Sequence, residues 1–92
     1  GAPAVRTALP SFKQYREKDG KFYFKLVDPR AQLLLQSTGF TSPRDAGQAI
    51  AQLQGEGQTA LTRFADQLTP VEGVTPAAVI AALQALKSAA AD

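Results

Sequence analysis

The feature that most constrains the fold is the dipeptide Asp19-Gly20, which separates two runs rich in strand-forming residues, FKQYREK and KFYFKLV. An Asp-Gly pair between such runs is a strong short-range signal for a β-hairpin with a two-residue turn. The sequence therefore predicts a hairpin from Phe12 to Val27, and this hairpin is the centre of any fold that the chain can adopt.

A two-residue turn fixes how the two strands pair, because side chains alternate between the faces of a sheet. In this register Lys18 faces Lys21 and Tyr15 faces Phe24. The face expected to join the core then holds Tyr15, Phe22, Phe24 and Leu26. The other face is basic and has one aromatic side chain at its centre; it holds Gln14, Arg16, Lys18, Lys21, Tyr23 and Lys25. A three-residue loop would break this pairing.

One more strand and three helices are expected after the hairpin. Asp28-Pro29-Arg30 is typical of a turn, and Gln32 to Gln36 reads as a strand in which Leu34 points away from its neighbours Leu33 and Leu35. The helices are expected from 43 to about 53, from about 59 to 68, and from 76 to 87. The predicted fold class is α+β, a three-stranded antiparallel sheet followed by three helices in the order βββααα.

The first and third helices begin with the same signal, Ser42-Pro43 and Thr75-Pro76. In each, a hydroxyl caps the helix and proline takes the first helical position, where its missing N–H costs nothing. Gly47 is expected to let the first helix lie close to the sheet, and Gly55 and Gly57 are expected to end it.

The chain is expected to form a single small domain over residues 12–87, made of a βββα unit at 12–54 and two tail helices at 58–87. Residues 1–11 have the composition of a flexible linker, and 88–92 are expected to be a disordered tail. The chain begins with Gly1 and contains no methionine, so it reads as a piece of a longer protein.

The composition argues against catalysis by this chain alone. The sequence has no histidine and no cysteine, so it lacks the usual general base, any catalytic triad and any thiol nucleophile. No cofactor site, metal site or small-molecule substrate is therefore expected. No apolar run is long enough to cross a bilayer, so no membrane contact is expected, and a cytoplasmic location fits the absence of cysteine.

Positive charge is concentrated at the hairpin end of the chain. Residues 1–44 carry eight bases and three acids, whereas residues 45–92 carry two bases and five acids. Lysine and arginine neutralise phosphates and an aromatic ring stacks on bases, so this surface is a candidate for RNA binding. The candidate residues are Lys13, Arg16, Lys18, Lys21, Tyr23, Lys25, Arg30 and Arg44. The alternative is an ordinary solvated strand face, on which lysines keep the sheet soluble.

The run SFKQYREKDGKFYFKLVD, followed by LLLQSTGFTSPRDAGQAIAQLQ, resembles the appended C-terminal domain of long-form bacterial tryptophan-tRNA ligases. The later helical segments LTRFADQL and VTPAAVIAALQAL are similar more loosely. The Phe-Tyr-Phe-Lys-Leu strand is also similar to small bacterial β-β-β-α domains whose function is unsettled.

The first resemblance implies a parent enzyme that activates tryptophan with ATP and charges tRNA in the cytoplasm as a homodimer. The catalytic motifs of such ligases contain histidine and methionine, so this chain cannot hold them and the catalytic residues lie elsewhere. The expected function is a non-catalytic accessory domain that assists tRNA binding through the basic hairpin face. The alternative is a structural module without nucleic-acid contact. It would pair with a second copy, or dock on the catalytic body, through Leu34 and the Leu61/Phe64 or Val79/Leu83 stripes.

Overall fold

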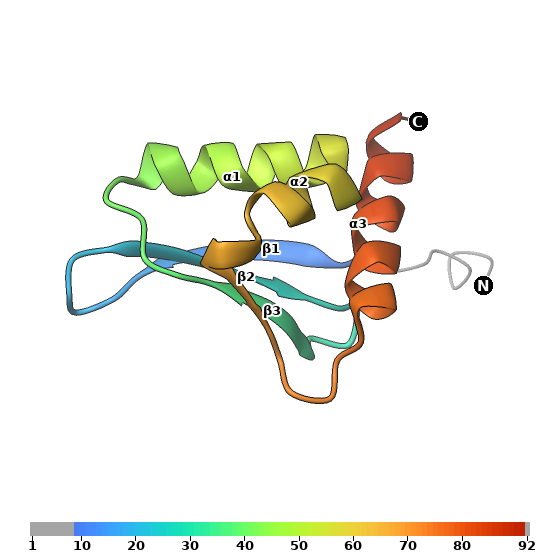
Figure 1. Cartoon of the computed structure of the whole chain (residues 1–92), viewed down its shortest axis with the longest axis horizontal. Coiled ribbons are helices and arrows are strands. Elements are labelled where there is room, and N and C mark those ends of the chain that lie inside the picture. Colours follow the sequence, from blue (N-terminus) through green and yellow to red (C-terminus); the bar gives the residue numbers. More distant parts are fainter. Residues whose placement is uncertain (1–8, 92) are drawn as a thin grey trace, which may run out of the picture.

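A computed structural model describes residues 9–91 of the chain, and Figure 1 shows its elements. In chain order these are β1 (Ser11–Arg16), β2 (Phe22–Val27), β3 (Leu33–Ser37), α1 (Pro43–Glu56), α2 (Gln58–Arg63), the 3-10 turn η2 (Ala65–Gln67), β4 (Leu68–Pro70) and α3 (Pro76–Ala91).

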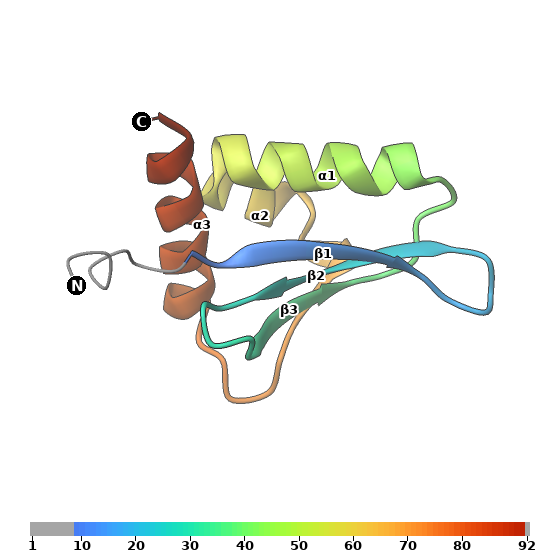
Figure 2. The same cartoon turned by 180° about the vertical axis from the view of Figure 1, so that it is seen from behind.

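The strands form one antiparallel sheet in the order β1-β2-β3-β4. Helices α1 and α2 lie over one face of this sheet, and α3 stands across one end of it (Figure 1). Seen from behind, the same helices still lie on that one side (Figure 2). The α+β class is thus confirmed, with one face of the sheet covered and the other open to solvent.

The expected order βββααα is wrong in one respect, because a fourth strand lies between α2 and α3. Leu68 was expected to be the last apolar position of the second helix, but it is extended, with φ −126° and ψ 138°. Pro70 pairs with Leu35 at the edge of the sheet, where a residue without an N–H is tolerated. The apolar side chain of Leu68 is still buried in this strand, with an exposed fraction of 8%.

The hairpin is where expected, but its register differs by one residue. The loop has three residues, Lys18-Asp19-Gly20, and is closed by hydrogen bonds from Glu17 N to Lys21 O at 3.1 Å and from Gly20 N to Glu17 O at 3.0 Å. Gly20 has a φ of +82°, the left-handed conformation that turns a type I turn into a three-residue hairpin loop. Tyr15 therefore pairs with Tyr23, not with Phe24.

This one-residue shift exchanges the two faces of β1, as the period of two requires. We call the side covered by α1 and α2 the helix face; on the hairpin it consists of Phe12, Gln14, Arg16, Phe22, Phe24 and Leu26. We call the opposite side the open face; on the hairpin it consists of Lys13, Tyr15, Glu17, Lys21, Tyr23 and Lys25. The expectation that Tyr15 joins the core is wrong, and so is the placement of Arg16 and Gln14 on the basic face.

Specific contacts hold the unexpected polar residues on the helix face. Gln14 Nε2 donates a hydrogen bond to the carbonyl of Pro43 at the start of α1, at 3.0 Å. The guanidinium of Arg16 lies over the ring of Phe22, 5.4 Å from its centroid. Both side chains remain exposed, so their polar groups keep contact with water while lying on the helix side of the sheet.

The third strand also differs from the expected alternation. The pairing of β2 with β3 shifts between Leu26 and Val27, which leaves one extra residue in β3. As a result Leu34 and Leu35 are both buried, with exposed fractions of 9% and 1%. Leu34 was expected to point away from Leu35 toward a separate surface; it lies instead beside the alanines of α3.

Helix α1 begins as predicted and ends later. Its cap is confirmed by the hydrogen bond from Asp45 N to Ser42 Oγ at 3.1 Å, with Pro43 at the start. The helix passes through Gly55 and ends at Gly57, which has a φ of +58°. A Cβ at Gly47 would lie 4.0 Å from Gln14 Oε1, so the helix does lie against β1, yet this distance does not require glycine.

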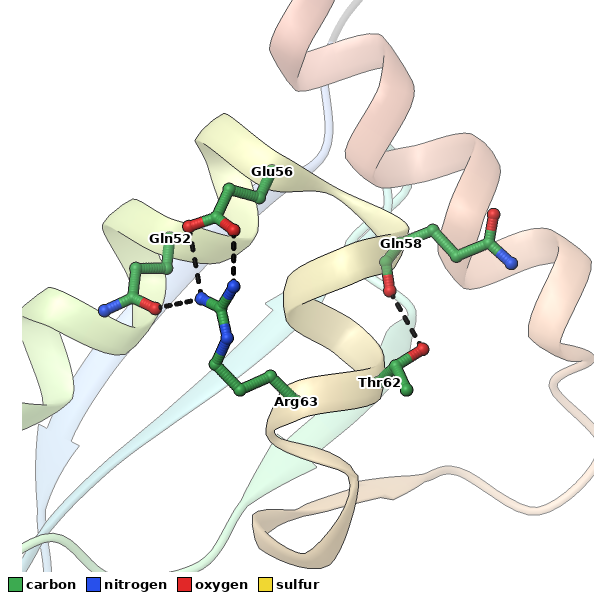
Figure 3. A network of polar contacts seen from close by, with 5 residues as sticks. All are labelled: Gln52, Glu56, Gln58, Thr62 and Arg63. Carbon is green, nitrogen blue, oxygen red and sulfur yellow. Dashed lines mark hydrogen bonds and ion pairs between the residues drawn. The ribbon is translucent and has the colours of Figure 1, made fainter.

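Arg63 ties the short helix α2 to α1. Its guanidinium donates to both carboxylate oxygens of Glu56, at 2.7 and 3.2 Å, and to Gln52 Oε1 at 2.6 Å (Figure 3). Within α2 the hydroxyl of Thr62 donates to the carbonyl of Gln58 at 3.1 Å (Figure 3). The forked geometry of the guanidinium orients α2 across the end of α1.

Helix α3 completes the core. Its cap is confirmed, since Ala78 N donates to Thr75 Oγ1 at 3.2 Å. Val79 and Leu83 are buried, with exposed fractions of 1% and 0%, so the tail helix packs against the rest of the domain. The helix continues to Ala91, whereas a disordered tail was expected from residue 88. The last turns are rich in alanine, which has the highest helix propensity of all residues.

Candidate nucleic-acid interface

The open face is a polar surface built from cross-strand neighbours. Lys13 pairs with Lys25 on the next strand, and Lys25 pairs with Gln36 on β3. Gln36 in turn pairs with Thr69 on β4, so one row of polar side chains crosses the sheet from edge to edge. The amino groups of Lys13 and Lys25 therefore stand on the same side of the sheet, opposite the helices.

Two tyrosines form the next row of the open face. Tyr15 and Tyr23 are stacked, with ring centroids 5.6 Å apart and an interplanar angle of 15°. The ammonium group of Lys25 lies 5.6 Å from the centroid of the Tyr15 ring, a cation–π arrangement. These are the two tyrosines of the sequence, and both are only partly buried. The sheet thus presents an aromatic pair with positive charge beside it.

The position of Tyr23 is fixed from two sides. Its hydroxyl donates a hydrogen bond to Asp19 Oδ2 at 2.5 Å, while Asp19 Oδ1 accepts the backbone N–H of Lys21 at 2.8 Å. On its other side the ring lies against Gly39, where a Cβ would come within 3.0 Å of Tyr23 Cζ. The turn and the segment after β3 therefore hold this ring in place before any ligand arrives.

Both tyrosines keep their protons at neutral pH. The hydrogen bond to Asp19 raises the pKa of Tyr23, and the same bond lowers the pKa of Asp19. Burial raises the pKa of Tyr15, with a smaller contribution from the negative charge of Glu17. Both hydroxyls therefore remain hydrogen-bond donors.

A shallow hollow of about 460 Å³ opens beside the tyrosine pair. It lies between the hairpin loop and β3 and is lined by Tyr15, Glu17, Lys18, Asp19, Tyr23, Gln36 and Ser37. Its walls combine aromatic faces with carboxylates and an amide.

The structure brings together some of the predicted site residues and separates others. Four of the eight lie on the open face, namely Lys13, Lys21, Tyr23 and Lys25. Lys18 is in the hairpin loop and lines the hollow. Arg16 lies on the helix face, Arg30 in the turn after β2, and Arg44 on the exposed first turn of α1.

Sequence reasoning missed Tyr15, Glu17 and Gln36 as members of this surface. The available signal was Phe12, which faces Leu26 only if the loop has three residues and then extends the apolar face. Within residues 9–91, no group of three or more His, Cys, Asp or Glu side chains could hold a metal ion. No helix in the same range is long and apolar enough to cross a membrane.

These features define a small α+β domain with one closed and one open sheet face. Residues 17–63 match the family model described as a domain of unknown function, DUF1508, and the chain belongs to this family. No solved structure gives a significant match.

The chain is also homologous to part of several tryptophan-tRNA ligases, which confirms the resemblance. It is 49% identical over 90 residues to the ligase of a Xylella fastidiosa strain, covering 98% of this chain and 20% of the ligase. It is 53% identical over 84 residues to that of Xanthomonas axonopodis pv. citri, covering 91% of this chain and 19% of the ligase. With Xanthomonas campestris the identity is 70% over 50 residues, 54% of this chain and 12% of the ligase. The matched part of the chain thus spans about a fifth of the length of the first two relatives and about an eighth of the third.

Proposed function

We propose that this domain is a non-catalytic accessory part of a tryptophan-tRNA ligase, and that its open face binds tRNA. The observation that carries the proposal is the placement of Lys13 and Lys25 beside the stacked pair of Tyr15 and Tyr23. Sheets that bind RNA commonly combine aromatic rings, on which bases stack, with lysines that neutralise phosphates.

The relation to the ligases supports this choice of ligand. A domain attached to an enzyme that handles tRNA is held near a large polyanion, so the effective concentration of its ligand is high. A modest affinity of the open face would then suffice. Activation of tryptophan with ATP, the charging reaction and the cytoplasmic location would belong to the whole ligase, because the chain matches only about a fifth of it and has no histidine.

The proposal is tested by titrating tRNA into the domain at 50 and 200 mM salt, with fluorescence anisotropy of labelled tRNA as the readout. Binding that depends on phosphate contacts weakens steeply with salt. On single strands, the logarithm of the binding constant falls by about 0.7 per phosphate contact for each tenfold rise in salt concentration. The double variant Lys13→Glu/Lys25→Glu is expected to bind more weakly and to lose about two such contacts from the slope.

A variant with the same change of charge serves as the control. Arg30→Glu/Arg44→Glu alters two arginines away from the open face. We expect it to keep most of the affinity and the slope. Equal losses in the two double variants, or no binding of tRNA by the unchanged domain at either salt concentration, would reject the open face as the binding surface.

One observation favours a second candidate, a docking module without RNA contact. The apolar residues expected to dock a partner pack largely inside the domain, because Leu34, Val79 and Leu83 are buried. The observation that favours docking is an apolar hollow of about 430 Å³, where Leu9, exposed at 46%, adjoins the alanines of α3. It could seat the catalytic body of the ligase or a second copy of the domain.

Two measurements test this candidate. Sedimentation velocity over a wide range of concentration tests self-association, and a domain that stays monomeric throughout would count against pairing of two copies. Charging assays of a ligase with and without this segment test the role in the whole enzyme. If the ligase without this segment lost thermal stability but kept its tRNA affinity, the result would favour docking over RNA binding.

A further inference from the structure

The hollow on the open face is lined by one acidic side chain, that of Glu17, whose carboxylate takes no part in the contacts of the hairpin. The backbone of Glu17 closes the hairpin loop, through the bonds to Lys21 O and from Gly20 N. No hydrogen bond or ion pair to its carboxylate is found among residues 9–91. The carboxylate of Asp19, in contrast, is occupied by Tyr23 and by the N–H of Lys21.

The Glu17 side chain lines the same hollow as both tyrosines. Its negative charge contributes to raising the pKa of Tyr15 and, to a lesser degree than Asp19, that of Tyr23. All three side chains line the same hollow, and Gln36 lines it as well. A flat base bound in this hollow would lie among a tyrosine ring, the amide of Gln36 and the carboxylate oxygens of Glu17.

A carboxylate selects among bases by the donors on their edges. Guanine carries two adjacent donors, N1–H and the N2 amino group, which match the two oxygens of a carboxylate; adenine, cytosine and uracil do not offer this pair. The amide N–H of Gln36 is the kind of donor that guanine O6 accepts. These edges are free only in unpaired nucleotides, and stacking on a side chain also requires an unpaired base.

We infer that this hollow takes one unpaired guanine, stacked on the tyrosine pair and bound through its N1–H and N2 amino group by the carboxylate of Glu17. The neighbouring lysines Lys13 and Lys25 would neutralise the flanking phosphates. This inference rests on the proposed RNA binding and adds its specificity.

The test uses labelled five-nucleotide RNAs that differ only at the centre, UUGUU, UUAUU, UUCUU and UUUUU, together with inosine at the same place. We expect the guanine RNA to bind about 10-fold more tightly than the others, the effect of one good bidentate contact. Inosine, which keeps N1–H but lacks the amino group, should lie between. Annealing the guanine RNA to its complement should remove the preference.

The variant Glu17→Gln separates this inference from general RNA binding. It should abolish the guanine preference and leave the affinity for UUUUU equal or slightly higher, because a negative charge is removed. Glu72→Gln, an exposed acid in the loop before α3, is the matched control and should keep the preference. Equal binding of all five RNAs, or a preference that survives in Glu17→Gln, would overturn the guanine site alone. Failure of every RNA to bind would overturn the proposed function as well.

Discussion

The two faces of the sheet are made by the same strands but have opposite characters. On the helix face, Phe24, Leu26 and Leu35 are almost fully buried under the helices. On the open face, Tyr15, Tyr23 and Lys25 are partly exposed, and the ring of Tyr15 contacts the other two side chains. The difference depends on one residue in the hairpin loop, because a shift by one residue exchanges the faces of β1. Fold and proposed function are therefore set by the same register.

The largest expected effect comes from adjacent residues on opposite faces. Leu26 is fully buried and Val27 is only partly buried. We expect Leu26→Ala to lower the free energy of unfolding by about 2–5 kcal/mol, through lost burial and the cavity left behind. Val27→Ala should cost clearly less. Urea denaturation measures both, and equal losses would contradict the assignment of the faces.

A second pair of neighbours separates binding from stability. Tyr15→Ala should weaken RNA binding by about 1–3 kcal/mol, the contribution of one stacked base, with little effect on folding. Arg16→Ala should leave the RNA affinity nearly unchanged and lower the melting temperature, because its stem and charge pack on Phe22. The opposite result, with Arg16 needed for binding and Tyr15 for stability, would contradict this register and support the pairing expected from a two-residue turn.

Two glycines sharpen the comparison further. A Cβ at Gly39 would meet Lys21 Cβ at 2.9 Å and Tyr23 Cζ at 3.0 Å, so Gly39→Ala should destabilise the domain by about 1 kcal/mol and move the tyrosine. A Cβ at Gly55 meets nothing within 4 Å, so Gly55→Ala should stabilise helix α1 by about 0.5–1 kcal/mol. Tyrosine fluorescence should change only in the first variant, because the chain has two tyrosines and no tryptophan.

The smallest effect is expected at the exposed ion pair between α2 and α1. The hydrogen bonds from Arg63 lower the pKa of Glu56 below its ordinary value of 4.5. A carboxyl whose pKa is lowered by folding stabilises the folded state above its ordinary pKa, and this contribution is lost as the pH falls through the folded pKa. Glu56→Gln should therefore lower the melting temperature slightly at pH 7 and not at pH 2. A difference that persists at low pH would assign the effect to packing.

Local chemistry in the sequence predicted the parts of the fold that depend on neighbouring residues. The hydroxyl of Ser42 caps α1 and that of Thr75 caps α3, as expected from Ser-Pro and Thr-Pro alone. The hairpin position also follows from Asp19-Gly20. In each of these cases the decisive contacts lie within a few residues along the chain.

The register and the fourth strand could not be predicted in the same way, because distant contacts decide them. The polar residues Gln14 and Arg16 made the wrong face look solvent-exposed, but one bonds to α1 and the other lies on Phe22. Leu68 fits an apolar helix position and a strand position equally well, and its pairing with Ser37 decides between them. The candidate site was half predicted for the same reason: Lys21, Tyr23 and Lys25 kept the face expected of them, whereas the residues of β1 changed sides.

The most direct test of the central claim is to map the RNA-binding surface residue by residue. Amide chemical shifts of the domain, labelled with ¹⁵N, would be followed while tRNA is added. We predict that the largest changes occur at Lys13, Tyr15, Tyr23, Lys25 and Gln36. Changes confined to α1, α3 or the Arg16 side of the hairpin would contradict the assignment of the open face to RNA.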